Sequence, residues 1–70
     1  DPEWVEVWLS SHTKEVIHDF EELLSKLKVN YRDGVIKFPE RAVKVVFANS
    51  SQLEKLIELS DHIAEYRKAK

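Results

Sequence analysis

The chain has 70 residues, including 11 Lys and Arg, 13 Asp and Glu, three His, one Gly and no Cys. This length fits one domain spanning residues 1–70, because two separate hydrophobic cores need about 100 residues or more. An apolar content of 43% with 34% charged residues is typical of a soluble globular domain and excludes a disordered tail. The lack of Cys excludes disulfides, thiol nucleophiles and Cys-ligated metals. We expect no targeting segment and no membrane partner, since no apolar run approaches the roughly 18 residues of a spanning helix, and the compartment stays unknown.

Residues 4–9 alternate with the two-residue period of a half-buried strand. The side expected to be buried carries Val5, Val7 and Leu9, and the exposed side carries Trp4, Glu6 and Trp8. Residues 10–13 offer N-cap side chains, which predicts a helix from there to about Lys28. Its apolar residues recur at three- and four-residue spacing and are Val16, Ile17, Phe20, Leu23, Leu24 and Leu27.

Asp33-Gly34 separates two short segments, residues 29–32 and 35–38, that read as strands. Because Asp and Gly accept positive φ at both central positions of a two-residue turn, this dipeptide predicts a hairpin between them. Residues 39–41 are interpreted as a second, looser turn around Pro39. Residues 42–48 form the next predicted strand, with Val43, Val45 and Phe47 on the side expected to be buried.

Asn49 to Ser51 precede the last apolar stripe, and Ser51 with Glu54 fits a capping box. The stripe contains Leu53, Leu56, Ile57, Leu59, Ile63 and Tyr66. We therefore expect a helix that runs to the C-terminus and ends with the basic residues Arg67, Lys68 and Lys70. The alternative ends this helix at Ser60-Asp61 and makes residues 62–70 a final strand, which gives a ferredoxin-like βαββαβ order. The helix is preferred because a strand there would mix apolar and charged side chains on each face.

These elements predict an α+β fold with the order β-α-β-β-(β)-α. Two amphipathic helices then cover one face of an antiparallel sheet of three or four strands, as in a two-layer sandwich. The residues expected beneath the helices are Val5, Val7, Leu9, Val29, Tyr31, Ile36, Phe38, Val43, Val45 and Phe47.

The sequence offers no arrangement typical of catalysis. Ser10 and Ser11 stand beside His12, but neighbours at a helix start rarely converge as nucleophile and base, and no orienting acid is evident. Glu21 and Glu22 point about 100° apart on a helix, so they cannot share a proton as a catalytic pair does. We interpret these residues as caps and as a solvated face, and we expect no enzyme activity.

The three histidines, His12, His18 and His62, do not form a metal-binding pattern. His18 and Glu22 stand at i, i+4 and could share a ligand, and Asp61 precedes His62, but two ligands do not make a metal site. A single Gly also excludes the Gly-rich phosphate loops of nucleotide-binding proteins. We expect no metal and no cofactor.

The sheet face turned away from the helices, called the open face below, is the candidate binding surface. Its predicted binding residues are Trp4, Trp8, Arg32, Lys37 and Lys44. Its other expected members are Glu6, Asn30, Val35, Ala42 and Val46. Because Trp is enriched at binding hot spots, we expect a protein partner or a second copy of the chain to dock there. Aromatic and basic residues on an open sheet can also stack unpaired bases and contact phosphates, so single-stranded nucleic acid is the alternative partner.

Taken together, the features predict a small structural or protein-interaction module without catalytic activity. A designed protein with no biological function belongs to the same class, since caps, turn and patterning all agree on one fold, as they do in designs. The formal net charge of −2 argues against strong binding of nucleic acid.

Overall fold

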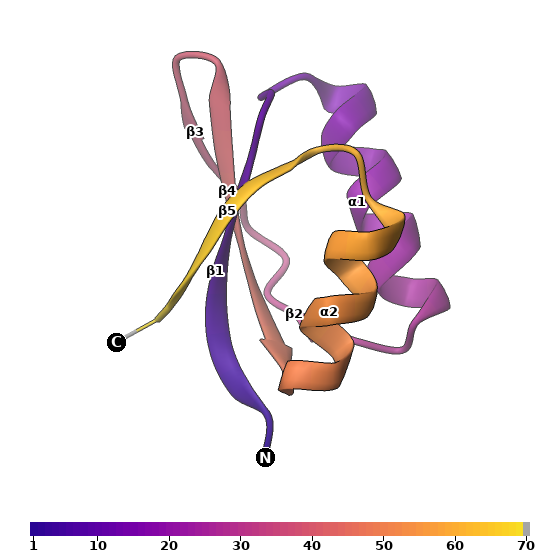
Figure 1. Cartoon of the computed structure of the whole chain (residues 1–70). Helices are drawn as coiled ribbons and strands as arrows, with labels where there is room; N and C mark the ends of the chain where they lie inside the picture. Colours follow the sequence, from indigo (N-terminus) through magenta and orange to yellow (C-terminus); the bar gives the residue numbers. More distant parts are fainter. Residues whose placement is uncertain (70) are drawn as a thin grey trace.

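A computed structural model describes residues 1–69 and shows two layers, with both helices on one face of a single sheet (Figure 1). The elements in chain order are β1 (Glu3–Leu9), α1 (Lys14–Lys26), β2 (Asn30–Tyr31), β3 (Ile36–Phe38), β4 (Arg41–Ala48), α2 (Ser50–Leu59) and β5 (Ile63–Lys68). Neither α1 nor α2 is long and apolar enough to cross a lipid bilayer. The predicted fold class, α+β with two helices on one face of an antiparallel sheet, is confirmed.

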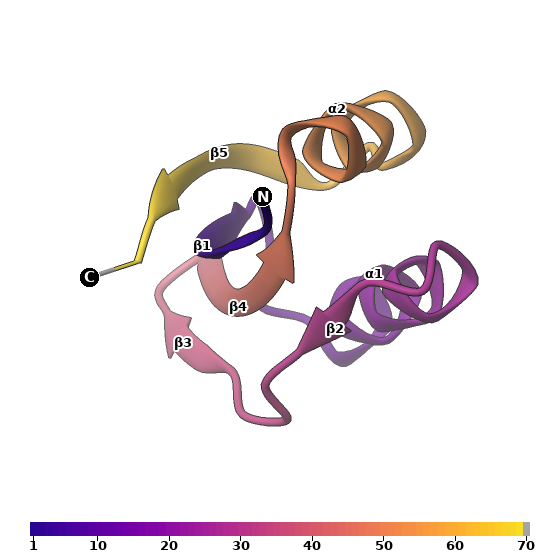
Figure 2. The same cartoon turned by 90° about the horizontal axis from the view of Figure 1, so that it is seen from below.

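The sheet has five strands in the order β2-β4-β1-β5, and β3 also pairs with β4. β2 pairs with the C-terminal end of β4 and β3 with its N-terminal end, so these two short strands form one broken edge. Every pairing is antiparallel. Figure 2 shows β1 and β4 in the middle of the sheet, with β5 on the side away from β2 and β3. With β2 and β3 taken as one interrupted strand, the chain has the βαββαβ order of the ferredoxin-like alternative.

The preferred prediction of a helix to the C-terminus is wrong for residues 63–68. α2 ends at Leu59, and the chain then returns along β1 as the edge strand β5. Arg67 and Lys68 therefore lie in a strand and not at the end of a helix. Lys70, the third residue of the predicted basic helix end, lies outside the described residues.

A β-bulge explains why β5 did not look like a strand in the sequence. Trp8 lies opposite Glu65 and Leu9 lies opposite Ile63, so Ala64 is an extra residue between the two pairs. The extra residue shifts the two-residue alternation by one position. Apolar and charged residues consequently fall out of phase in the sequence although the strand is regularly paired on either side of the bulge.

The predicted hairpin at Asp33-Gly34 is not formed. β2 and β3 each pair with β4, and Gly34 does not have a positive φ. The chain reverses instead at Pro39-Glu40, where Phe38 pairs with Arg41 and Glu40 has a φ of 60°. Pro followed by a residue with positive φ is typical of a type II turn. The turn predicted to be loose is therefore the tight one.

Pairing with β1 determines which side of β4 faces the helices. The buried residues of β1 are Val5, Val7 and Leu9, as predicted. Their partners on β4 are Val46, Lys44 and Ala42. Because opposed residues of paired strands point to the same face, these three lie beneath the helices and the predicted assignment of β4 is reversed. Both faces of β4 carry β-branched residues, so the alternation alone did not distinguish them.

The same reversal moves several predicted core residues to the open face. Those residues are Ile36, Phe38, Val43, Val45 and Phe47, by their register with β1 and β4. Val35 was predicted for the open face and instead packs against the core, whereas Val29 and Tyr31 lie with the core as predicted. The buried core consists of Val5, Val7, Leu9, Ile17, Phe20, Leu24, Val29, Ala42, Val46, Ala48 and Leu56.

Both helices begin with a side-chain cap. Thr13, one of the predicted candidates, accepts a hydrogen bond from the backbone amide of Val16 and begins α1. α2 begins with a capping box, but its members are Asn49 and Gln52 and not the predicted Ser51 and Glu54. The cap therefore lies two residues earlier than predicted, which lengthens the helix at its N-terminus.

Candidate interaction surface on the open sheet face

Two pairs of aromatic rings occupy the open face. Trp4 and Phe47 are cross-strand partners of β1 and β4, with ring centroids 5.0 Å apart. Trp8 stacks on Phe38 of β3, at 5.4 Å and an interplanar angle of 12°. The Trp rings of β1 therefore cover β4 near both of its ends, Trp4 by its contact with Phe47 and Trp8 by its contact with Phe38 of the neighbouring β3, as expected of aromatic pairs on a sheet.

A guanidinium group lies near each Trp ring. Arg32 lies over Trp4 at 4.7 Å from the ring centroid, and Arg67 lies over Trp8 at 5.3 Å. These distances are within the range of cation–π attraction. Arg67 also forms an ion pair with Glu65, with Nε and Oε1 2.7 Å apart. Arg32 and Arg67 are thus held by rings of the open face, and Arg67 also by a carboxylate of the same surface.

Three of the five predicted binding residues, Trp4, Trp8 and Arg32, are brought together on the open face. The other two are not. Lys37 on β3 pairs with Ala42 of β4, which places Lys37 on the helix side of the sheet at the exposed hairpin. Lys44 lies beneath the helices and is fully buried. Both corrections follow from the reversed faces of β3 and β4.

Lys44 is the one charged side chain buried in the core of residues 1–69. Its Nζ lies 2.6 Å from Oε2 of Glu21 on α1, whose side chain is 30% exposed. It also donates to the backbone carbonyls of Asp33 and Gly34, at 2.9 and 3.1 Å. The ammonium lies 4.8 Å from the ring centroid of Tyr31. Lys44 therefore connects β4 to α1 and to the loop between β2 and β3, and its role here is structural.

The members of the open face that were not predicted from the sequence include Ile36, Phe38, Val43, Val45, Phe47, Glu65 and Arg67. The first five were placed in the core because β3 and β4 were assigned the wrong faces. Glu65 and Arg67 were missed because their segment was predicted to be helical. The signal that could have found them is the register with β1, since Trp8 and Glu65 are partners and Trp4 and Phe47 are partners.

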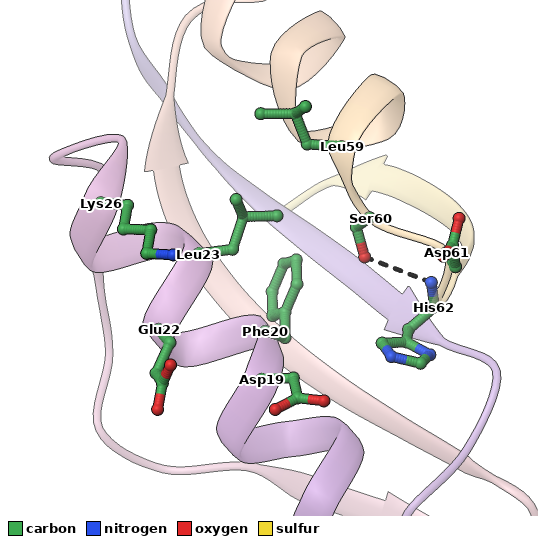
Figure 3. A pocket seen from close by; sticks show the side chains of 9 residues that line it. All are labelled: Asp19, Phe20, Glu22, Leu23, Lys26, Leu59, Ser60, Asp61 and His62. Atoms are coloured by element: carbon green, nitrogen blue, oxygen red, sulfur yellow. Dashed lines mark hydrogen bonds between the residues drawn. The ribbon is translucent and has the colours of Figure 1, made fainter.

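A polar hollow of about 270 Å³ lies between α1 and the segment that follows α2. Figure 3 shows Asp19 and His62 on facing sides of this hollow, while Asp61 points away from it. The amide of His62 donates to the hydroxyl of Ser60 at 3.2 Å, which shapes the turn into β5. The predicted i, i+4 contact is formed, with His18 Nε2 2.6 Å from Glu22 Oε1 at the surface. Within residues 1–69, no three His, Cys, Asp or Glu side chains are grouped closely enough to hold a metal ion.

Comparisons of the chain with protein-family models, with curated proteins and with solved structures found no match. The fold and the open face define a small α+β domain whose exposed sheet surface combines aromatic, aliphatic and arginine side chains. No family is assigned to it.

Proposed function

We propose that this chain is a small, non-catalytic interaction module that binds a protein partner through the open face. The observation that carries the proposal is the apolar surface that β1, β3 and β4 present there. Trp4, Ile36 and Phe38 are 37%, 57% and 43% exposed, although each is large and apolar. Gathered apolar side chains on one face mark interaction sites, and Trp and Arg are enriched among the residues that dominate binding energy.

The charges around the rings also favour a protein partner. Arg32, Arg41 and Arg67 are accompanied by Glu6 and Glu65 on the same face, by register and by the ring contacts. Protein interfaces commonly combine an apolar centre with a polar rim of mixed sign. A nucleic-acid backbone requires an excess of positive charge, and two of the predicted basic residues lie elsewhere. The mixture of three basic and two acidic side chains thus supports the protein partner.

Selection from a peptide library, with purified chain as bait, tests the proposal. We expect selected peptides to bind the natural sequence and to lose about tenfold or more in affinity with Trp8→Ala or Phe38→Ala, as hot-spot truncations do. Ile57→Ala is the matched control, because Ile57 is 46% exposed on α2, on the other side of the sheet. Peptides that bind the open-face variants as well as the natural sequence would contradict the proposal. A library that yields no binder would favour a purely structural protein, including a designed one with no biological function.

Single-stranded nucleic acid is the second candidate, because the Arg–Trp pairs could engage phosphates and bases together. The ring contacts oppose it, since Trp8 already stacks on Phe38 and a base would have to displace that ring. Titration of a mixed-sequence oligonucleotide, followed by Trp fluorescence at low and moderate salt, separates the two candidates. Salt-sensitive quenching that is lost with Trp8→Ala would favour nucleic acid, and a flat titration at micromolar concentration would exclude it.

A further inference from the structure

β5 is an open sheet edge of six residues. Within the described residues it pairs only with β1, and Figure 2 shows its other side facing away from the remaining strands. Every residue from Ala64 to Lys68 is exposed. The opposite edge is unlike it, because β2 and β3 have only two and three residues and are separated by a loop. Of these two edges, β5 offers the longer template for another strand, regularly paired with β1 from Glu65 to Lys68, after the bulge at Ala64.

The alternation of hydrogen-bonded and non-hydrogen-bonded pairs between β1 and β5 shows which backbone groups of β5 point away from β1. The amide of Ala69 donates to the carbonyl of Trp4 at 3.0 Å, so these two residues face each other at a hydrogen-bonded position of the β1–β5 ladder. Because such pairs alternate with non-bonded pairs, Arg67 and Glu65 also direct their amides and carbonyls toward β1. Tyr66 and Lys68 direct theirs outward. Tyr66 is therefore at the centre of the unpaired part of the edge.

The charges beside Tyr66 are self-complementary. Glu65 precedes it and Arg67 follows it, and both side chains lie on the open face. If two β5 strands pair antiparallel about Tyr66, Glu65 of each copy lies opposite Arg67 of the other. Glu65 and the opposing Arg67 then form a non-hydrogen-bonded pair, in which opposed side chains approach most closely. Charges on an edge strand usually oppose pairing, but in this register they attract, whereas a parallel in-register arrangement would place like charges together.

The side chains needed for this exchange are available. The ion pair between Glu65 and Arg67 within one chain is exposed, with side-chain fractions of 51% and 63%. Reorienting these side chains toward a second copy exchanges this pair for two pairs between the copies and gives up the contact of Arg67 with the Trp8 ring, at 5.3 Å. Tyr66 is 49% exposed on the helix side of the sheet, where it lines a hollow of about 340 Å³ together with Ile57 of α2. Pairing about Tyr66 covers this ring with its counterpart from the second copy.

We propose that two copies of this chain associate edge to edge through β5, antiparallel and centred on Tyr66, to form one sheet that continues across both copies. The two open faces then lie side by side on the same surface. The association uses the β5 edge and not the Trp rings, so it does not depend on the proposed binding of a partner by the open face.

Sedimentation equilibrium from 10 µM to 1 mM tests this association against the monomer mass of 8.2 kDa. We expect the apparent mass of the natural sequence to rise toward twice that value. Glu65→Arg and Arg67→Glu, each alone, place like charges opposite one another twice and should weaken association about tenfold or more. The double variant Glu65→Arg/Arg67→Glu restores opposite charges and should regain association. An equimolar mixture of the two single variants should form a heterodimer.

Two controls keep the test decisive. Circular dichroism and thermal unfolding verify that each charge variant is folded, and Lys37→Glu reverses a charge at the opposite edge and should leave association unchanged. A natural sequence that stays monomeric at 1 mM would overturn the proposal. So would a mixture of the charge variants that remains monomeric, or an association that is lost with Trp8→Ala but retained with Glu65→Arg.

Discussion

The ion pair between Glu21 and Lys44 predicts an unequal response to removing its two members. Lys44 is fully buried, whereas Glu21 is 30% exposed at the surface of α1. When one member of a buried pair is removed, the free energy lost depends on the environment of the charge that remains. Glu21→Ala leaves a buried ammonium, and Lys44→Met leaves a carboxylate that water can reach.

The contacts of Lys44 determine the expected magnitudes. Breaking a buried pair by removing one partner destabilises a protein by roughly 3–5 kcal/mol. The carbonyls of Asp33 and Gly34 still accept hydrogen bonds from Lys44 after Glu21→Ala, so we expect that variant to lose about 2–3 kcal/mol. Lys44→Met keeps the apolar part of the side chain and removes the buried charge, while both carbonyls belong to exposed residues that water can reach. We expect it to lose at most about 1 kcal/mol.

Urea unfolding of both variants and of the double variant provides the measurement. In the Lys44→Met background, Glu21→Ala should change the free energy of unfolding by less than about 0.5 kcal/mol, because no buried charge remains. The coupling between the two positions should then be near 2 kcal/mol. Glu22→Ala is the matched control and should be close to neutral, since its contact with His18 is mostly exposed. Lys44→Met proving more destabilising than Glu21→Ala would refute this reasoning.

Three further predictions concern local structure and are measured by the same unfolding experiment. Asn49→Ala should lose about 1 kcal/mol with the capping box of α2, while Ser51→Ala should be neutral because Ser51 is not the cap; equal losses would contradict the assigned helix start. Gly34→Ala should raise the free energy of unfolding by about 0.4–1 kcal/mol, because Gly34 lacks a positive φ and an added Cβ meets no atom within 4 Å; a large loss would indicate the hairpin turn predicted from the sequence. Leu24→Ala should lose about 2–5 kcal/mol from the core, whereas Leu59→Ala, at a residue 51% exposed, should stay within about 0.5 kcal/mol.

The parts of the fold that could be predicted are those whose pattern of apolar and polar residues is compatible with only one secondary structure and one buried side. The strand at residues 4–9 has aliphatic residues on one side only, and the first helix has a single apolar stripe, so both were placed correctly. The same alternation placed Trp4 and Trp8 on the open face. Local periodicity was sufficient for these elements because their polar and apolar sides differ.

The parts that could not be predicted depend on residues distant in the sequence. β4 carries apolar residues on both sides, and only its pairing with β1 shows that Lys44 is buried and Phe47 is on the open face. Asp33-Gly34 has the composition of a tight turn, but β4 pairs with both flanking strands and the turn is not needed. The predicted binding site combines residues of several strands, so an error in the face of any one strand changes its membership. Lys37 and Lys44 were assigned to it because the faces of β3 and β4 were reversed.

The position of β1 has a consequence for how the chain folds. β1 is the first strand of the sequence, yet its partners are β4 and β5, which come in the second half and at the end. Its pairing therefore requires closure of long loops, which is entropically unfavourable before many contacts have formed. We expect folding to be slower than that of a helical domain of this size, and β1 to join the sheet late. Until it does, the Trp residues that later cover the open face lie on an unpaired strand.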